Sequence, residues 1–177
     1  MNLYHKILFD WMGFREEISE PFPAKYIIAL APHTSNWDFI IGNLYSGTKN
    51  YRSDFLMKKE WFFWPLGILF RKMGGIPVYR SKKTSMTDTL AERIKEMEHF
   101  ELAVTPEGTR SKVTTWKRGF YFIALKAGIP IQLYDHDYKN KVIRCTKELI
   151  PTGDVEADMR EIMEYYKNSN AKYPEKF

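Results

Sequence analysis

Residues 26–38 read YIIALAPHTSNWD, in which an apolar run gives way to polar residues. The apolar run at residues 26–31 predicts a buried strand. Ser35 is a favourable N-cap, and Asp38 three residues later completes the spacing of a capping box, so we expect a helix to begin directly after Ser35. A buried strand that leads through a short loop into a helix is typical of an α/β fold.

The same stretch places a histidine and an aspartate, His33 and Asp38, five positions apart. Five residues along one helix correspond to about 500° of rotation, so the two side chains would not share a face if both were helical. They meet only if His33 lies in the loop and Asp38 in the first helical turn. An imidazole oriented by a carboxylate is a general base near neutral pH that takes a proton from a hydroxyl. The alternative is structural, with Asp38 as a cap and His33 as a hydrogen-bonded loop residue.

Helical and extended patterns alternate along the rest of the chain. We expect further strands near residues 55–57, 76–79, 101–105, 131–134 and 141–146. We expect helices within residues 59–73 and at residues 86–99, 117–127 and 154–167. This succession predicts a single α/β domain over residues 1–177, built as a mixed sheet flanked by helices.

Each end of the chain carries a further expectation. Apolar residues at helical spacing within residues 1–20 predict a short amphipathic N-terminal helix. Such a helix either docks on the core of its own protein, which is the commoner case, or lies in a membrane interface. Residues 170–177 follow the last predicted helix, and we expect them to form a loosely held tail.

The composition is that of a globular protein, with 44% apolar and 28% charged residues. Lys and Arg exceed Asp and Glu by 27 to 22, and the net charge of +5 favours anionic partners such as phosphate groups, acidic lipid surfaces or nucleic acid. The single cysteine, Cys145, excludes an intramolecular disulfide and a cysteine-rich metal site.

The longest apolar segment is the aromatic-rich stretch WFFWPLGILF at residues 61–70. It is shorter than the roughly 18 apolar residues that a membrane-spanning helix needs. The N-terminus lacks the pattern of a secretory signal peptide. We therefore expect a cytoplasmic protein that touches a membrane without spanning it. Residues 61–70 suit contact with an acyl chain or a membrane surface, and ordinary core packing is the alternative.

A second group of polar residues follows the strand expected at residues 101–105. In open α/β sheets, ligands bind beyond the carboxyl ends of the strands. Gly108 lets a backbone approach a ligand closely, Thr109 offers a hydroxyl, and Arg110 grips a phosphate through two hydrogen bonds. Glu107 would repel a phosphate, so its more plausible task is to hold the loop by accepting backbone N–H bonds or pairing with Arg110. Ordinary turn chemistry is the structural alternative.

Together with a glycine-rich segment that ends at Arg80, these stretches resemble the motifs of the glycerolipid (lysophosphatidate-type) acyltransferase family. The resemblance covers residues 27–134. The family carries four boxes in order: His-x4-Asp, here residues 33–38; a Gly-rich segment ending in arginine, here residues 75–80; Pro-Glu-Gly-Thr-Arg, here residues 106–110; and, more loosely, apolar-Pro-apolar, here residues 129–131. In two departures, Pro32 stands where many members have asparagine, and the last box lacks a further proline, which leaves Pro130 a structural residue.

The resemblance implies a glycerol-phosphate acyltransferase-like fold and an O-acyltransferase activity. His33 would take the proton of an acceptor hydroxyl while Asp38 fixes its tautomer. The oxygen would attack an acyl thioester carried by coenzyme A or acyl carrier protein, with no metal or other cofactor. The implied substrate-binding residues are Arg80, Glu107, Gly108, Thr109 and Arg110.

The family's default acceptor is a lysophospholipid, 1-acyl-glycerol-3-phosphate, although glycerol phosphate, an aminolipid or another lysolipid would need the same base. Many members have an N-terminal transmembrane segment, and we expect none in this protein because the sequence holds no apolar run of that length. We therefore expect peripheral binding to the anionic inner face of the cell membrane.

Two other classes of function compete with this interpretation. A nucleic-acid-binding module would use the basic charge and the aromatic residues, but the sequence lacks RNP-type motifs, zinc-finger spacing and long basic runs, so we expect no nucleic-acid partner. A metal-dependent hydrolase would use residues 135–137, Asp-His-Asp, together with His33. Adjacent strand residues alternate between faces, so these three side chains would not converge without a bend.

Overall fold

Strands and helices alternate along the chain in the computed structural model of the protein, which describes residues 2–19, 21–49, 54–78 and 83–177. The described strands are β1 (Arg15–Ile18), β2 (Lys25–Leu30), β3 (Asp54–Lys58), β4 (Gly75–Val78), β5 (Phe100–Val104), β6 (Ile131–Asp137) and β7 (Val142–Leu149). They form one sheet in the order β1-β7-β6-β2-β5-β3-β4. The pair β6–β7 is antiparallel and the other neighbouring pairs are parallel, so the predicted mixed α/β sheet is confirmed.

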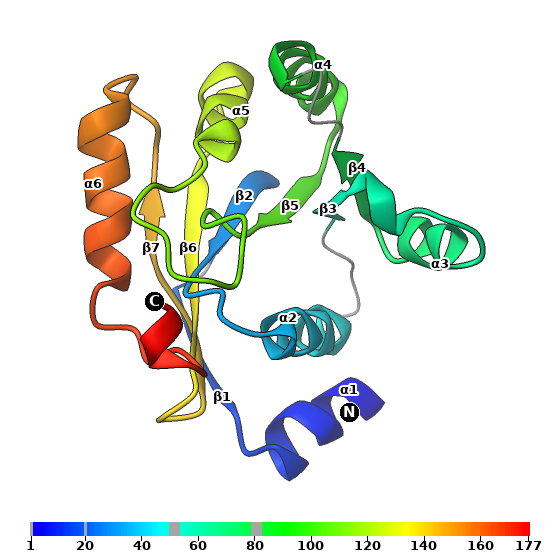
Figure 1. The fold of residues 1–177 in the computed structure, drawn as a ribbon, viewed down its shortest axis with the longest axis vertical. Helices are drawn as coiled ribbons and strands as arrows, with labels where there is room; N and C mark the ends of the chain where they lie inside the picture. Colours follow the sequence, from blue (N-terminus) through cyan, green and yellow to red (C-terminus); the bar gives the residue numbers. More distant parts are fainter. Residues whose placement is uncertain (1, 20, 50–53, 79–82) are drawn as a thin grey trace.

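Helices cover both faces of this sheet. They are α1 (Leu3–His5), which continues as a π-helix at Lys6–Trp11, α2 (Asn36–Thr48), α3 (Leu66–Lys72), α4 (Lys83–Glu96), α5 (Gly119–Ala127) and α6 (Val155–Tyr166), with 3₁₀ turns at Lys59–Trp61 and Pro174–Lys176. Figure 1 shows α4, α5 and α6 on one side of the sheet, α1 and α2 on the other, and α3 beyond the β3–β4 end.

The central strand β2 shows why two layers of helices form. Its side chains alternate, so Ile27 and Ala29 pack into the core beneath α4, α5 and α6, whereas Tyr26 and Ile28 pack into the core beneath the N-terminal helix and α2. A strand that is buried on both faces is typical of a parallel sheet covered by helices on both sides. The apolar run at residues 26–31 therefore contributes side chains to both hydrophobic cores.

The N-terminal helix is shorter than the predicted span of residues 1–20. It ends at Trp11, Gly13 turns the chain with a φ of 71°, and residues 15–18 form the edge strand β1 paired with β7. Leu8 is fully buried and Phe14 nearly so, which places the helix on the protein's own core. A glycine in the left-handed conformation ends a helix readily, and this stop precedes the strand.

The prediction of a loosely held tail at residues 170–177 is wrong. Ala171 is buried, and the ring of Phe177 packs beside Trp116 at a centroid distance of 6.4 Å. The backbone N–H of Tyr173 donates to the hydroxyl of Thr34 at 3.2 Å, next to His33. Long-range hydrogen bonds and aromatic contacts hold this segment, and they leave no periodic pattern in the sequence.

Smaller differences concern the bounds of elements. Of the helical structure expected within residues 59–73, helix α3 begins only at Leu66, directly after Pro65. Proline is tolerated at a helix start because the first turn does not use its N–H groups. The C-terminal end of α5 is as predicted, with Gly128 as the left-handed cap at a φ of 67°.

The register of the central strands brings two loops together. Strands β2 and β5 run parallel, with Ala29 opposite Val104, so their carboxyl ends lie side by side at one edge of the sheet. The loop that carries His33 follows β2, and the loop that carries Glu107 to Arg110 follows β5. The topology therefore joins the two sharpest sequence motifs in one place.

Candidate active site

A histidine–aspartate pair lies at the start of α2. Ser35 caps the helix: its hydroxyl accepts the backbone N–H of Trp37 at 3.1 Å, and its own N–H donates to Asp38 Oδ2 at 2.9 Å, completing the predicted capping box. His33 remains in the preceding loop, and its Nδ1 lies 3.0 Å from Asp38 Oδ2. The pairing predicted from the spacing is therefore present in the structure.

The Asp38 carboxylate is fully buried and surrounded by donors. Besides His33 and Ser35, Oδ2 accepts the backbone N–H of Thr34 at 3.0 Å, and Oδ1 accepts the hydroxyl of Tyr138 at 2.5 Å. Burial by itself raises the pKa of Asp38, but the hydrogen bonds from His33, Tyr138 and Ser35 outweigh it and hold that pKa below its ordinary value. Asp38 is therefore ionised near neutral pH.

This charge state assigns the proton of the pair. An ionised carboxylate only accepts hydrogen bonds, so Nδ1 of His33 carries the hydrogen that it shares with Asp38. In the neutral imidazole this tautomer leaves the lone pair on Nε2, and 18% of the side-chain surface of His33 is exposed. The geometry has the form of a general base that is oriented by a carboxylate and open to a substrate.

Glu107 connects the two loops. Its side chain is buried, and Oε1 accepts the backbone N–H of His33 at 2.7 Å. Burial raises the pKa of Glu107, although the hydrogen bond from the His33 backbone opposes this rise. Of the tasks considered for Glu107, this position fits the holding of the loop better than direct contact with a substrate.

The rest of the Pro-Glu-Gly-Thr-Arg loop approaches the start of α2. Gly108 has a φ of 65°, a conformation that favours glycine, and an added Cβ would lie 3.1 Å from the side chain of Lys117. Thr109 Oγ1 accepts the backbone N–H of Ser111 at 3.4 Å. The exposed guanidinium of Arg110 donates to the side-chain oxygen of Asn36, the first residue of α2.

Arg110 therefore places a cation at the N-terminus of α2, in the loop cluster that holds His33. The N-terminus of a helix attracts anions through its dipole and free N–H groups, and arginine adds charge-assisted hydrogen bonds. Arg80, the remaining predicted binding residue, lies outside the described residues.

Two contributors were missed by the sequence reasoning. Asn36 stands at a helix start, where its role as an acceptor for Arg110 has no local signal. Tyr138 is separated by 100 positions from Asp38, the residue that it contacts. Only the fold reveals a contact of that range.

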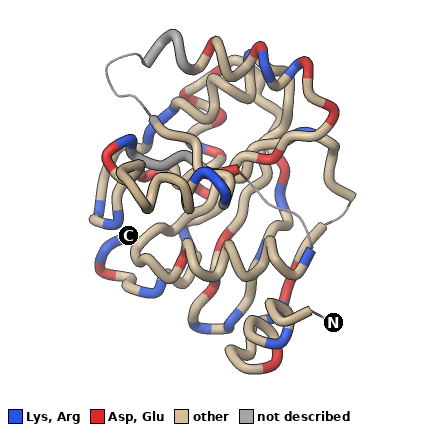
Figure 2. Tube along the Cα trace, turned by 90° about the vertical axis from the view of Figure 1, so that its right-hand side faces the viewer, with Lys and Arg blue, Asp and Glu red and all other residues tan. Residues whose placement is uncertain are grey.

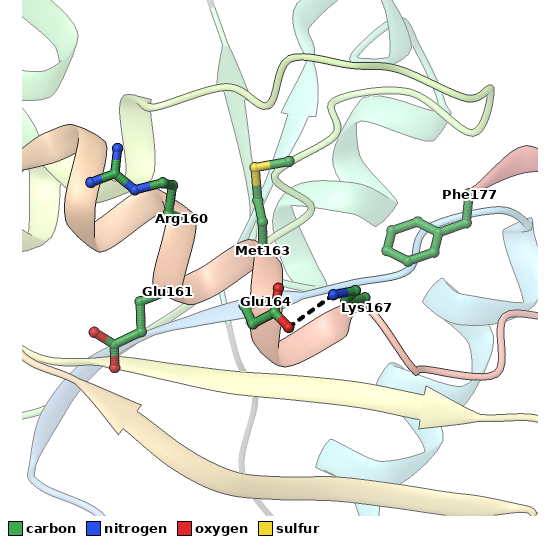
Figure 3. Close-up of a pocket in the computed structure, with 6 residues that line it drawn as sticks. All are labelled: Arg160, Glu161, Met163, Glu164, Lys167 and Phe177. Atoms are coloured by element: carbon green, nitrogen blue, oxygen red, sulfur yellow. Dashed lines mark hydrogen bonds and ion pairs between the residues drawn. The ribbon is translucent and has the colours of Figure 1, made fainter.

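Surface hollows lie away from this site. One has a volume of about 760 Å³ and is lined by residues of α6 and by Phe177 (Figure 3), and no predicted site residue lines it. Another of about 250 Å³ lies between Ser19, Pro21 and residues 145–148, also without a predicted site residue. The site is therefore defined by its hydrogen bonds and the meeting of its loops.

The two aspartates of the alternative metal site have other partners, and Asp137 accepts from the side chains of Asn140 and Asn170. Asp135 accepts from Arg144 and from the hydroxyl of Ser169, whereas His136 is buried, which lowers its pKa to about 4. Within residues 2–19, 21–49, 54–78 and 83–177, no group of three or more His, Cys, Asp or Glu is arranged to hold a metal ion.

The distribution of charge and the hydropathy of the helices bear on two other questions, nucleic-acid binding and the crossing of a membrane. Lys and Arg are interspersed with Asp and Glu along the described trace (Figure 2), unlike the basic stripe typical of a nucleic-acid-binding face. Among the helices that the structure describes, none has both the length and the apolar character needed to cross a membrane.

Comparisons with known proteins place the chain. Residues 13–132 match the model of a family described as Acyltransferase. The fold is similar to the crystal structure of the 1-acyl-sn-glycerophosphate (LPA) acyltransferase PlsC from Thermotoga maritima, with a TM-score of 0.58 and 19% sequence identity over 96% of this chain and 79% of that chain. No curated protein sequence matches the chain. The family match spans most of the chain and includes both loops of the site, and the protein therefore belongs to the acyltransferase family and shares the fold of a glycerolipid acyltransferase.

Proposed function

We propose that the protein transfers a fatty acyl group from an acyl thioester to the hydroxyl of a lysophospholipid, most simply 1-acyl-glycerol-3-phosphate. The observation that carries this proposal is the His33–Asp38 pair, which lies beside a loop that presents Arg110. The substrate itself supplies the nucleophile, so the protein needs a base and a holder for the acceptor.

The reaction begins with proton transfer. Nε2 of His33 takes the proton of the acceptor hydroxyl as its oxygen attacks the thioester carbonyl carbon. When the resulting intermediate collapses, the carbon–sulfur bond breaks and the new ester forms. The thiolate leaves and receives the proton from the His33 imidazolium, which Asp38 stabilises throughout. A positioned base supplies roughly 10²- to 10⁴-fold in rate, and the remaining acceleration comes from holding both substrates in place.

The acceptor's phosphate is held near the N-terminus of α2. There the Arg110 guanidinium and the helix dipole both favour a negative charge. A glycerol phosphate headgroup in this place presents its hydroxyl toward His33, because both groups belong to the same loop cluster. Arg80 would complete the cationic holder, as the family resemblance implies.

The test is a direct assay with the purified protein. Labelled acyl-coenzyme A and labelled acyl carrier protein are each incubated with a panel of acceptors: lysophosphatidate, other lysophospholipids, glycerol phosphate and aminolipids. We expect a labelled phospholipid from lysophosphatidate. The absence of any acylated product from every pair of donor and acceptor would falsify the proposed activity.

A lipid surface is the proposed docking partner of the aromatic patch, defined here as Trp61, Phe63, Trp64, Ile68 and Leu69. Each of these side chains is at least half exposed, and Trp64 is 82% exposed. Exposed cations flank the patch at Lys59, Arg71 and Lys72. Indole rings with neighbouring cations suit the interface of an anionic bilayer, and the proposed substrates reside there.

Loss of two indoles from the aromatic patch is expected to weaken binding to vesicles. Replacing Trp61 and Trp64 together by alanine should lower partitioning onto phosphatidylcholine–phosphatidylglycerol vesicles by at least about tenfold, because each buried aromatic ring contributes apolar transfer free energy. Co-sedimentation measures the partitioning, and added salt should weaken the binding of the unaltered protein. Ile150→Ala removes an exposed apolar side chain outside the patch and should bind normally. Equal partitioning of all three proteins would remove the patch from this role.

A further inference from the structure

Tyr138 contacts the site from a part of the chain that the family match does not include. It directly follows β6, whereas the match ends at residue 132. Its hydroxyl donates to Asp38 Oδ1 at 2.5 Å. Tyr138 therefore lies in the C-terminal third of the chain, beyond the matched residues.

The two carboxylate oxygens of Asp38 have different partners. Oδ2 accepts from His33 and from the backbone N–H groups of Thr34 and Ser35, and Oδ1 accepts from Tyr138. Asp38 is fully buried, so water has little access to Oδ1. Without the phenol, a charged oxygen would lie buried without this partner, and the carboxylate would lose the contact that opposes its rotation.

A segment near the C-terminus holds Tyr138 in turn. We call residues 170–173 the strap. The carbonyl of Asn170 accepts the backbone N–H of Tyr138 at 3.0 Å. The ammonium of Lys172 lies 5.4 Å from the ring centroid of Tyr138 and 4.7 Å from that of Trp37, within the range of cation–π attraction. The strap also bonds to Thr34 through the Tyr173 backbone, so one short segment fixes both the tyrosine and the His33 loop.

We propose that Tyr138, held by the strap, is a positioning residue for the His33–Asp38 pair. Its hydroxyl fixes the plane of the Asp38 carboxylate, and this plane fixes the ring of His33. The proposal rests on the proposed function, because it concerns how the base is aimed during acyl transfer.

Removal of the hydroxyl should affect turnover more than substrate binding. Tyr138→Phe removes one hydrogen bond to the charged carboxylate of Asp38. From the free energy of such a bond we expect kcat to fall by about 10- to 100-fold. The KM values of both substrates should stay unchanged, since Tyr138 bonds to Asp38 and not to Arg110 or Thr109. Without the phenol, one hydrogen bond fewer opposes the effect of burial, so the pKa of Asp38 rises. A more basic carboxylate holds the shared proton of the pair more strongly, so the acidic limb of the pH profile of kcat should move to higher pH.

Tyr121 offers a matched control. Its hydroxyl donates to the carboxylate of Asp158 at 2.7 Å, and both side chains are buried in the α5–α6 layer on the other side of the sheet. Tyr121→Phe therefore removes the same chemical contact away from the site. We expect it to lower thermal stability while leaving kcat and the pH profile unchanged.

The experiment compares kcat, KM, the pH profile and thermal stability of the unaltered protein, Tyr138→Phe and Tyr121→Phe. A lower kcat and a shifted acidic limb in Tyr138→Phe alone would support the proposal. Unchanged kcat and pH profile in Tyr138→Phe, or the same losses in both variants, would overturn it.

A second measurement does not depend on activity. The Nδ1–H proton of His33 gives a nuclear magnetic resonance signal that is assigned by its absence in His33→Ala. A shifted or exchange-broadened signal in Tyr138→Phe supports the proposal, and an identical signal overturns it. If the unaltered protein transfers no acyl group, the proposed function fails on its own, and this signal still decides whether Tyr138 positions the pair.

Discussion

Replacing His33 by alanine is expected to lower kcat for acyl transfer by about 10²- to 10⁴-fold, the range that a positioned general base contributes. The reason is that Nε2 of His33 is the atom that takes the acceptor's proton, and alanine offers no substitute. The fold should be retained, because the hydrogen bond to Glu107 uses the backbone N–H of residue 33. Asp38 also keeps its bonds from Thr34, Ser35 and Tyr138.

Steady-state assays with the purified variant measure this loss, and thermal unfolding monitored by circular dichroism checks the fold. His99→Ala is the matched control, since His99 is exposed and precedes β5 at the opposite end of that strand from the site. It should behave like the unaltered protein. A folded His33→Ala protein that keeps most of its activity would show that another group acts as the base.

Replacing Arg110 by alanine is expected to raise the KM for a phosphorylated acceptor by about 10- to 100-fold, because a guanidinium forms charge-assisted hydrogen bonds to phosphate. The KM for the thioester donor should change little. The side chain of Arg110 is exposed and donates to the side-chain oxygen of Asn36, so the substitution should cost little stability. Initial rates at varied acceptor and fixed donor concentration, and then the reverse, separate the two constants.

Arg160→Ala serves as a control for the loss of one positive charge, because Arg160 is exposed on α6 outside the site. It should leave both KM values unchanged. Arg110→Lys keeps the charge but loses the planar fork, and we expect an intermediate KM for the acceptor. An acceptor KM that is the same in Arg110→Ala and the unaltered protein would exclude Arg110 as the phosphate holder.

The site residues that the sequence predicted share one property: their contacts are local or follow from strand order. The capping box places Asp38 opposite the loop that holds His33, and five positions of separation are enough to predict their pairing. The loop at residues 106–110 joins them because β5 runs parallel beside β2. Glu107 was predicted to hold the loop because its charge would repel a phosphate. Its hydrogen bond from the backbone N–H of His33 fits that role.

The features that escaped prediction lack a periodic signal. Strand β1 reads Arg-Glu-Glu-Ile at the edge of the sheet, with its first three side chains exposed, so no apolar alternation marks it as extended. Its pairing with β7 spans more than 120 positions. The strap and Tyr138 depend on backbone hydrogen bonds and on a cation near aromatic rings, and these are visible only once the fold brings the chain ends together.

The carboxylate of Asp38 has both a structural and a chemical role. The oxygen that orients the imidazole also accepts the N–H of Ser35 and closes the first turn of α2. Selection for stability alone would therefore retain this aspartate. A relative that no longer catalysed the reaction would still keep one residue of the His33–Asp38 pair. Conversely, a change that silences the chemistry through Asp38 would also loosen the helix, so inactivation and instability would be inherited together.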